Sequence, residues 1–250
     1  TPDVVAAWAA RLGELCAQTV RLPVNVGAPA ARNWLLSLPV LREYDFCAFL
    51  DDDALLPGDW AASLGGAVAA YPQAGTWGCK VVDLGGTGRV QHADIQLLPP
   101  ADGPEHGREA GAESLALHRP QESEADFGQF DYLRPAASVT GCFHLFSTQT
   151  LLAAPRFDLR FSPSQLDDLD HDLALLETGR TACYQGLLTV RHARATGSAG
   201  LSGDAAGRFA GNALKLNAKW PRERLEPLQR AMTARLLGDL AAKEEELARA

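Results

Sequence analysis

Three acidic residues in a row follow an apolar segment of the chain. Residues 44–50 read YDFCAFL, a run typical of a strand buried on both faces, and Asp51, Asp52 and Asp53 come directly after it. At the carboxyl end of such a strand, side chains project into the crevice where open α/β sheets bind their ligands. Adjacent carboxylates repel one another, and a divalent cation is their simplest stabilising partner. The triplet therefore predicts a metal site, although a polar turn that caps the next helix would use the same residue types.

A second acidic cluster, DDLDHD, opens a predicted helix at residues 167–172. The helix dipole stabilises carboxylates in a first turn by about 0.3–1 kcal/mol each, which explains one or two of them. Four aspartates within six residues exceed what capping requires. On a helix, Asp168 and Asp172 share one face, and Asp167, Asp170 and His171 share another. An aspartate held at a helix start near a substrate hydroxyl can act as a general base, which is the alternative interpretation of the cluster.

A single histidine, His192, follows the strand predicted for residues 181–190. A lone histidine at the end of a strand is more often structural or exposed than a metal ligand. Its place in the order of the motifs, after both acidic clusters, makes it a candidate ligand.

The spacing of apolar residues predicts the elements that position these side chains. Alternation of strands and helices up to residue 83 indicates a parallel sheet covered by helices on both sides. Strands are predicted at 18–24, 44–50, 76–83, 88–97 and 181–190, and helices at 4–17, 28–38, 57–71 and 167–179, with two more helical stretches after residue 207. The polar segments 99–129 and 195–207 are predicted to be loops, and the first could close over a bound ligand.

Composition limits the classes of function that fit. The chain has 31 acidic and 23 basic residues and a net charge of -8, which argues against nucleic-acid binding, since that requires a basic face. Its five cysteines occur singly, without a CxxC pair, as expected in a reducing cytoplasm. No apolar run approaches the ~18 residues of a membrane span, and the layout of a signal peptide is absent. We therefore expect a cytoplasmic protein without a transmembrane segment, and the start at Thr1 suggests a processed or excised chain.

The order and spacing of several motifs resemble one enzyme family. The motifs are NVGAPAARN at 25–33, FLDDD at 49–53, TGCFHLFS at 140–147, FDLRFSPSQLDDLD at 157–170, ETGR at 177–180 and RH at 191–192. This series resembles the inverting family-two glycosyltransferases with the GT-A fold, over about residues 1–192. The resemblance implies an α/β fold with a mixed, mostly parallel sheet flanked by helices. It places a glycosyltransferase domain at 1–195 and a helical extension at 196–250.

The resemblance assigns the strand-end aspartates to the sugar nucleotide and its metal ion. Asp51 and Asp53, with Asp52 between them, match the family's acidic DXD motif. His192 matches a histidine that completes the metal site in some members. The implied cofactors are Mn²⁺ or Mg²⁺, with a nucleotide-diphosphate sugar as the donor.

The resemblance also supplies a catalytic base and two further donor-site residues. Asp168, with Asp167 beside it, matches the acidic pair that opens a later helix and removes the proton from the acceptor. The first residue of that pair is conventionally glutamate, and the aspartate here leaves open which of the two faces the acceptor. Arg32 and Asn33 match an Arg-Asn pair near the donor.

The implied reaction is transfer of a sugar to a hydroxyl group of a glycan, lipid or protein. Direct attack from the face opposite the nucleotide inverts the anomeric centre and requires one base. Two alternatives remain at this point. One is a non-catalytic domain of the same fold that binds carbohydrate or a partner protein. The other is a metal-dependent nucleotidyltransferase or phosphohydrolase, which would also use acidic residues and a metal.

One part of the family pattern has no counterpart in the sequence. Members begin with a strand, a helix and a second strand that hold the nucleobase, and Thr1 aligns just after them. The resemblance therefore implies that a longer parent protein supplies these nucleotide-binding strands, and the expected enzymatic activity depends on them.

Overall fold

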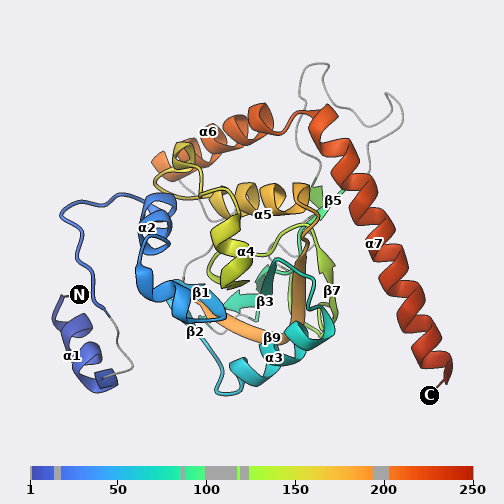
Figure 1. Cartoon of the computed structure of the whole chain (residues 1–250), viewed down its shortest axis with the longest axis horizontal. Coiled ribbons are helices and arrows are strands. Elements are labelled where there is room, and N and C mark those ends of the chain that lie inside the picture. The colour runs from blue at the N-terminus through green and yellow to red at the C-terminus, as the bar shows by residue number, and fades with distance from the viewer. Residues whose placement is uncertain are drawn as a thin grey trace.

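The computed structural model describes residues 2–13, 18–85, 88–98, 117–118, 124–193 and 203–249. Seven strands of this part of the chain form one mixed sheet, and helices lie above and below it (Figure 1). Most of the segment predicted as a long loop, namely 99–116 and 119–123, lies outside the described residues, as does 194–202. The predicted domain boundary at residue 195 lies within 194–202 and is therefore also outside the described residues.

In the described part of the chain, the six strands between Thr76 and Ser147 follow one another without a helix between them, and helices precede and follow this run. The strands of the main sheet are β1 (Phe46–Leu50), β2 (Ala54–Leu55), β3 (Thr76–Asp83), β4 (Val90–His92), β7 (Leu133–Ala136), β8 (Phe143–Ser147) and β9 (Ala182–His192). A separate two-stranded sheet joins β5 (Gln96–Leu97) to β6 (Leu117–His118). The helices are α1 (Pro2–Leu12), α2 (Ala28–Leu35), α3 (Trp60–Ala70), α4 (Thr148–Ala153), α5 (Asp167–Glu177), α6 (Asp204–Lys219) and α7 (Arg222–Arg249), with 3-10 turns η2 (Pro39–Glu43) and η4 (Leu159–Phe161).

The sheet confirms the predicted mixed α/β architecture, but its share of parallel strand pairings is smaller than predicted. Its strands lie in the order β1-β8-β3-β9-β2, with β4 beside β3 and β7 beside β9. Of the pairings between described strands, β3–β9 is parallel and the others are antiparallel. The expectation of a mostly parallel sheet is therefore corrected. The reason is that short return strands pair beside the long ones, and their direction is set by turns that the strand-helix alternation does not show.

The strand before the aspartate triplet has a different environment from the one predicted. β1 stands at the end of the strand order, and the side chains of Phe46 and Leu50 are 44% and 47% exposed. The interpretation of this run as a strand buried on both faces was wrong. Residues 18–24, also predicted as a strand, form none. Apolar composition identifies a segment suited to a strand, but its partners decide whether it pairs and is buried.

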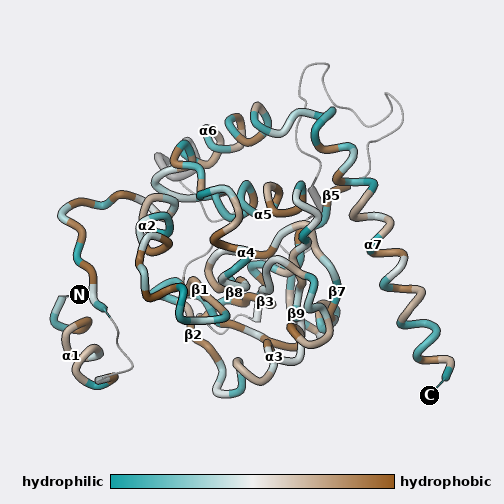
Figure 2. Tube along the Cα trace, in the orientation of Figure 1, coloured by the Kyte–Doolittle hydropathy of each residue, from teal (hydrophilic) through white to brown (hydrophobic). Residues whose placement is uncertain are grey.

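Hydrophobic clusters cover both faces of the sheet. Alternate residues of β8 point to opposite sides: Phe143 and Leu145 pack with α3, and Phe146 packs with α4, α5 and Leu36, which follows α2. Hydrophobic residues run through the central strands, whereas hydrophilic and hydrophobic turns alternate along α7 (Figure 2). The sheet and α5 thus form a packed base for the polar ends of β1 and β9.

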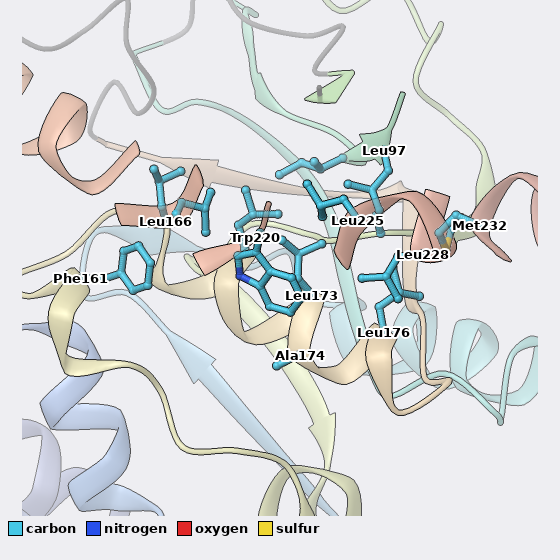
Figure 3. Packing of buried hydrophobic residues seen from close by; sticks show 14 residues of the cluster. Leu97, Phe161, Leu166, Leu173, Ala174, Leu176, Trp220, Leu225, Leu228 and Met232 are labelled. Carbon is cyan, nitrogen blue, oxygen red and sulfur yellow. The ribbon is translucent and has the colours of Figure 1, made fainter. Parts of the chain in front are cut away.

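The two C-terminal helices pack on the side of α5 that faces away from the sheet. Trp220 lies beside Leu173 of α5 and Leu225 of α7 in one buried cluster (Figure 3). This packing fixes α5 from both sides, so the start of α5 has a defined position relative to the sheet.

Candidate active site

A cavity of about 600 Å³ opens where β1 and β9 end and α5 begins. Its lining includes every predicted site residue except one: Arg32, Asp51, Asp52, Asp53, Asp167, Asp168 and His192. Residues 25–28 and 163–166 form further parts of the wall. The fold thus brings four stretches that are distant in the sequence, around residues 25–32, 51–53, 163–168 and 192, into one cleft.

The aspartate triplet reaches His192 because the chain turns back along the sheet. After β1 the turn leads into β2, which pairs antiparallel with β9 so that Ala54 lies opposite His192. The Ala193 amide donates to the Asp53 carbonyl over 2.9 Å and fixes the approach of the two segments. Sequence spacing alone cannot show this, because β8 and β3 lie between β1 and β9 in the sheet.

Two aspartates and one histidine converge in this turn. Nε2 of His192 lies 3.0 Å from Oδ1 of Asp53 and 4.0 Å from Oδ2 of Asp51, and one ligand atom from each residue lies within 4.8 Å of the other two. His192 is buried, Asp53 is half-buried and Asp51 is exposed, as is Asp52 beside them. Carboxylate oxygens with an imidazole nitrogen form a donor set that fits Mn²⁺ or Mg²⁺.

The electrostatics of Asp51 are consistent with a need for positive charge. Desolvation raises the pKa of Asp51, and the charges of Asp53 and Asp168 act in the same direction, whereas Arg32 and His192 oppose them. A divalent cation beside Asp51 would favour its ionised form and so reverse this shift.

The two aspartates that open α5 have different partners. Arg32 forms a salt bridge of 2.6 Å with Oδ2 of Asp167, and both side chains are buried. Asp168 is half-buried and accepts backbone N–H groups, with its Oδ2 2.8 Å from the Gly141 nitrogen and its Oδ1 2.8 Å from the Leu169 nitrogen. Asp167 is thus committed to an ion pair, whereas Asp168 is oriented by the backbone.

These partners also separate the pKa values of the two carboxyls. Burial raises the pKa of Asp167 to about 6, although the Arg32 charge acts against it. Burial also acts to raise the pKa of Asp168, but the Arg32 charge and the two backbone N–H groups outweigh it, so the pKa of Asp168 is lowered. At neutral pH Asp168 is therefore a carboxylate that can accept a proton.

Asn33 lies outside the lining of the cavity. Its side-chain amide donates to the carbonyl of Phe157 over 2.7 Å and accepts from the Phe157 N–H over 2.9 Å. These bonds tie α2 to the chain before η4. The predicted contact of Asn33 with the donor remains a prediction.

Two residues that the sequence analysis did not single out hold the cleft in shape. Gly141 lies between Arg32 and Asp168: a Cβ there would be 2.8 Å from Nη2 of Arg32 and 3.1 Å from Oδ2 of Asp168. Asn212, buried on α6, donates to the carbonyls of Ser164 and Gln165 over 2.9 and 3.0 Å. The glycine within TGCFHLFS was the available signal for the first, whereas no local pattern indicates the second.

The segment that Asn212 holds is conformationally unusual. Gln165 and Leu166 have φ angles of 84° and 68°, in the left-handed region that non-glycine residues rarely adopt. Such strain occurs where the surrounding structure imposes it, frequently at functional sites. Here it turns the chain so that Asp167 and Asp168 enter the cleft.

Comparisons with known proteins bear on the fold. No protein-family model and no curated protein matches the sequence. Among 41 matching chains of solved structures is one described as the crystal structure of GalNAc-T7 with UDP, GalNAc and Mn²⁺. It has a TM-score of 0.57 and 9% sequence identity. The fold is similar to that of a GT-A glycosyltransferase.

The similarity extends over most of this chain but not over most of the solved one. It covers 89% of the present chain and 40% of the GalNAc-T7 chain. At 9% identity it shows the fold alone, and functional roles rest on the geometry of the cleft. Within the described residues, none of the helices is long and apolar enough to cross a membrane.

Proposed function

We propose that this chain carries the reaction centre of a metal-dependent, inverting glycosyltransferase that moves a sugar from a nucleotide-diphosphate donor to an acceptor hydroxyl. One observation carries the proposal: a carboxylate–histidine set and an oriented aspartate base line the same cavity of a GT-A-like fold. The acceptor would be a hydroxyl of a glycan, lipid or protein.

In this proposal Asp51, Asp53 and His192 hold Mn²⁺ or Mg²⁺, with Asp52 beside the sugar nucleotide. A bound divalent cation would neutralise the negative charge that grows on the leaving diphosphate. The fit of the donor set and its place in the cavity support this assignment. Arg32 contributes a further positive charge at the wall of the cavity, although Asp167 already engages it.

Asp168 is the proposed base. Its two backbone N–H donors fix the direction of the carboxylate and keep it ionised, so it can accept the proton of the acceptor hydroxyl as that oxygen attacks the sugar. General-base catalysis contributes about 10²–10⁴-fold to a rate. Asp167 is the weaker candidate because its Oδ2 is bound to Arg32.

The complete donor site would include nucleotide-binding strands from a longer parent protein. The position of β1 supports this part of the proposal: it ends the strand order, and its Phe46 and Leu50 side chains are about half exposed. Within the described residues, β8 is the strand that pairs with β1, so the other edge of β1, next to the aspartate triplet, is the edge at which such a strand would add.

The experiment measures donor hydrolysis and sugar transfer by the longer parent protein with Mn²⁺, beginning with UDP-sugars because the GalNAc-T7 structure contains UDP. We expect Asp168→Asn to lower turnover by about 100-fold or more while nucleotide binding persists. Asp53→Ala should abolish metal-dependent nucleotide binding. Turnover that survives both substitutions would refute the assignment.

A second function, non-catalytic binding of carbohydrate or protein, is favoured by the exposed edge of β1. It predicts glycan binding that does not change when Mn²⁺ is removed and no donor turnover by the parent protein. The same binding and turnover assays therefore separate the two proposals.

A further inference from the structure

A buried glutamine contacts the side of His192 that faces away from the aspartates. Gln91 lies on β4, and its Oε1 is 2.9 Å from Nδ1 of His192. Both side chains are almost fully buried. Asp83, at the end of β3, lies next to His192 in the parallel register of β3 and β9. The end of β3 thus carries a chain of polar contacts from Asp83 through Gln91 to His192.

The partners of the Gln91 side chain fix the orientation of its amide. Nε2 of Gln91 donates to Oδ1 of Asp83 over 2.7 Å and to the His192 carbonyl over 3.2 Å. A carboxylate and a carbonyl only accept hydrogen bonds, so the NH₂ end of the amide must face them. The carbonyl end, Oε1, must then face the imidazole.

The amide orientation in turn fixes the tautomer of the imidazole. Because Oε1 of Gln91 can only accept, Nδ1 of His192 must carry the hydrogen. In the neutral ring, Nε2 then presents its lone pair toward Oδ1 of Asp53, 3.0 Å away. Two acceptor atoms at this separation repel each other unless a proton or a metal ion is shared between them, and Nε2 is the nitrogen that faces the aspartates.

We propose that Gln91 is a positioning residue for the metal site: its amide holds His192 in the Nδ1–H tautomer and aims Nε2 at the cation shared with Asp51 and Asp53. This inference rests on the proposed metal site. Second-shell partners of this kind typically change metal affinity by about 10–100-fold. Gln91 acts through His192 and does not touch the cation.

The test measures Mn²⁺ affinity by titration in the absence of donor and acceptor. Gln91→Met keeps the approximate length of the side chain but removes the acceptor, and we expect it to weaken Mn²⁺ binding by about 10–100-fold. Gln96→Met is the matched control. Gln96 is also buried, on β5 of the separate two-stranded sheet, and its amide binds Asp94 and the Pro135 carbonyl, so Mn²⁺ affinity should not change.

The outcomes separate this inference from the proposed function. If Asp53→Ala leaves Mn²⁺ binding intact, the metal site itself is wrong. If Asp53→Ala abolishes binding but folded Gln91→Met binds Mn²⁺ as tightly as the wild type, only the role of Gln91 is refuted.

A measurement on the wild-type protein covers the case in which Gln91→Met does not fold. Long-range proton–nitrogen spectra of the Mg²⁺-loaded protein report which ring nitrogen of His192 is protonated. We expect the hydrogen on Nδ1. A hydrogen on Nε2 would overturn the proposal, because that nitrogen could not then bind the cation.

Discussion

Neighbouring aspartates in this cleft differ because their hydrogen-bond partners differ. Asp167 is buried against the guanidinium of Arg32, whereas Asp168 receives N–H groups from Gly141 and Leu169. The backbone of Gly141 is held through both its polar groups, since its carbonyl also accepts from Nη2 of Arg32 over 3.1 Å. The position of one backbone unit therefore couples the ion pair to the proposed base.

This coupling predicts the effect of a single methyl group. Gly141→Ala places a Cβ 2.8 Å from Nη2 of Arg32 and 3.1 Å from Oδ2 of Asp168, so one of the two side chains must move. We expect a stability loss of about 1–3 kcal/mol and a fall in turnover of about 10–100-fold. Thermal unfolding and steady-state kinetics measure the two effects. Gly65→Ala on α3 is the control, because its Cβ meets nothing within 4 Å; wild-type turnover in Gly141→Ala would contradict the account.

At the scale of elements, α5 uses two faces for two tasks. Asp168 and Asp172 lie on the face toward residues 138–141, and Asp172 accepts from Oγ of Ser138 over 2.7 Å and from the Val139 N–H over 3.2 Å. Asp170 lies toward α6, where it binds Trp220 over 2.8 Å and Lys219 over 2.7 Å. One face therefore shapes the cleft wall, and the other anchors the C-terminal helices.

Because the two faces of α5 have different contacts, replacing an aspartate by asparagine should have different consequences on each face. Asp172→Asn weakens the anchor of the 138–141 segment, which carries the N–H donor for Asp168, so turnover should fall by about 10–100-fold. Mn²⁺ affinity should not change, because the metal site lies in the turn between β1 and β2 and at the end of β9. Asp170→Asn should lower the melting temperature but leave kcat unaltered. Equal losses of kcat in both variants would contradict this assignment of separate roles to the two faces of α5.

The junction of η4 with α6 predicts a pH effect on stability. Hydrogen bonds from Arg160 lower the pKa of Asp158, desolvation partly opposes them, and Lys219 adds to the lowering. A folded pKa below the unfolded value, about 3.9, stabilises the native state above that pH, and the stabilisation is lost as the pH falls through the folded value.

Asp158→Asn should therefore cost about 1–2 kcal/mol at pH 7 and clearly less near pH 2, because the stabilisation fades as the pH falls below the unfolded value of about 3.9. Denaturant unfolding of variant and wild type at several pH values measures this difference. A cost that is the same at both extremes would show that the charge of Asp158 is not involved.

At the scale of the whole molecule, local sequence patterns predicted where strands and helices lie better than they predicted which of these elements pair or pack together. The strand before Asp51, the helix that opens at Asp167 and the strand that ends at His192 are all present, because each has a local apolar pattern and a polar boundary. The exposure of Phe46 and the antiparallel return of β2 were not predicted, since both depend on which strands pair.

The candidate site shows the same division. Order and spacing of motifs pointed to Asp51, Asp53, Asp168 and His192, and the fold places them in one cavity. Gln91 carries no local signal, because its importance arises from a contact with a residue about a hundred positions away.

Crystals of the parent protein with Mn²⁺ and UDP, measured at the manganese absorption edge, test the central claim most directly. We predict one anomalous peak bound by Asp51, Asp53 and Nε2 of His192, with the diphosphate in the cavity that Asp168 lines. A manganese ion bound elsewhere, or a nucleotide in a cavity that Asp168 does not reach, would contradict the account.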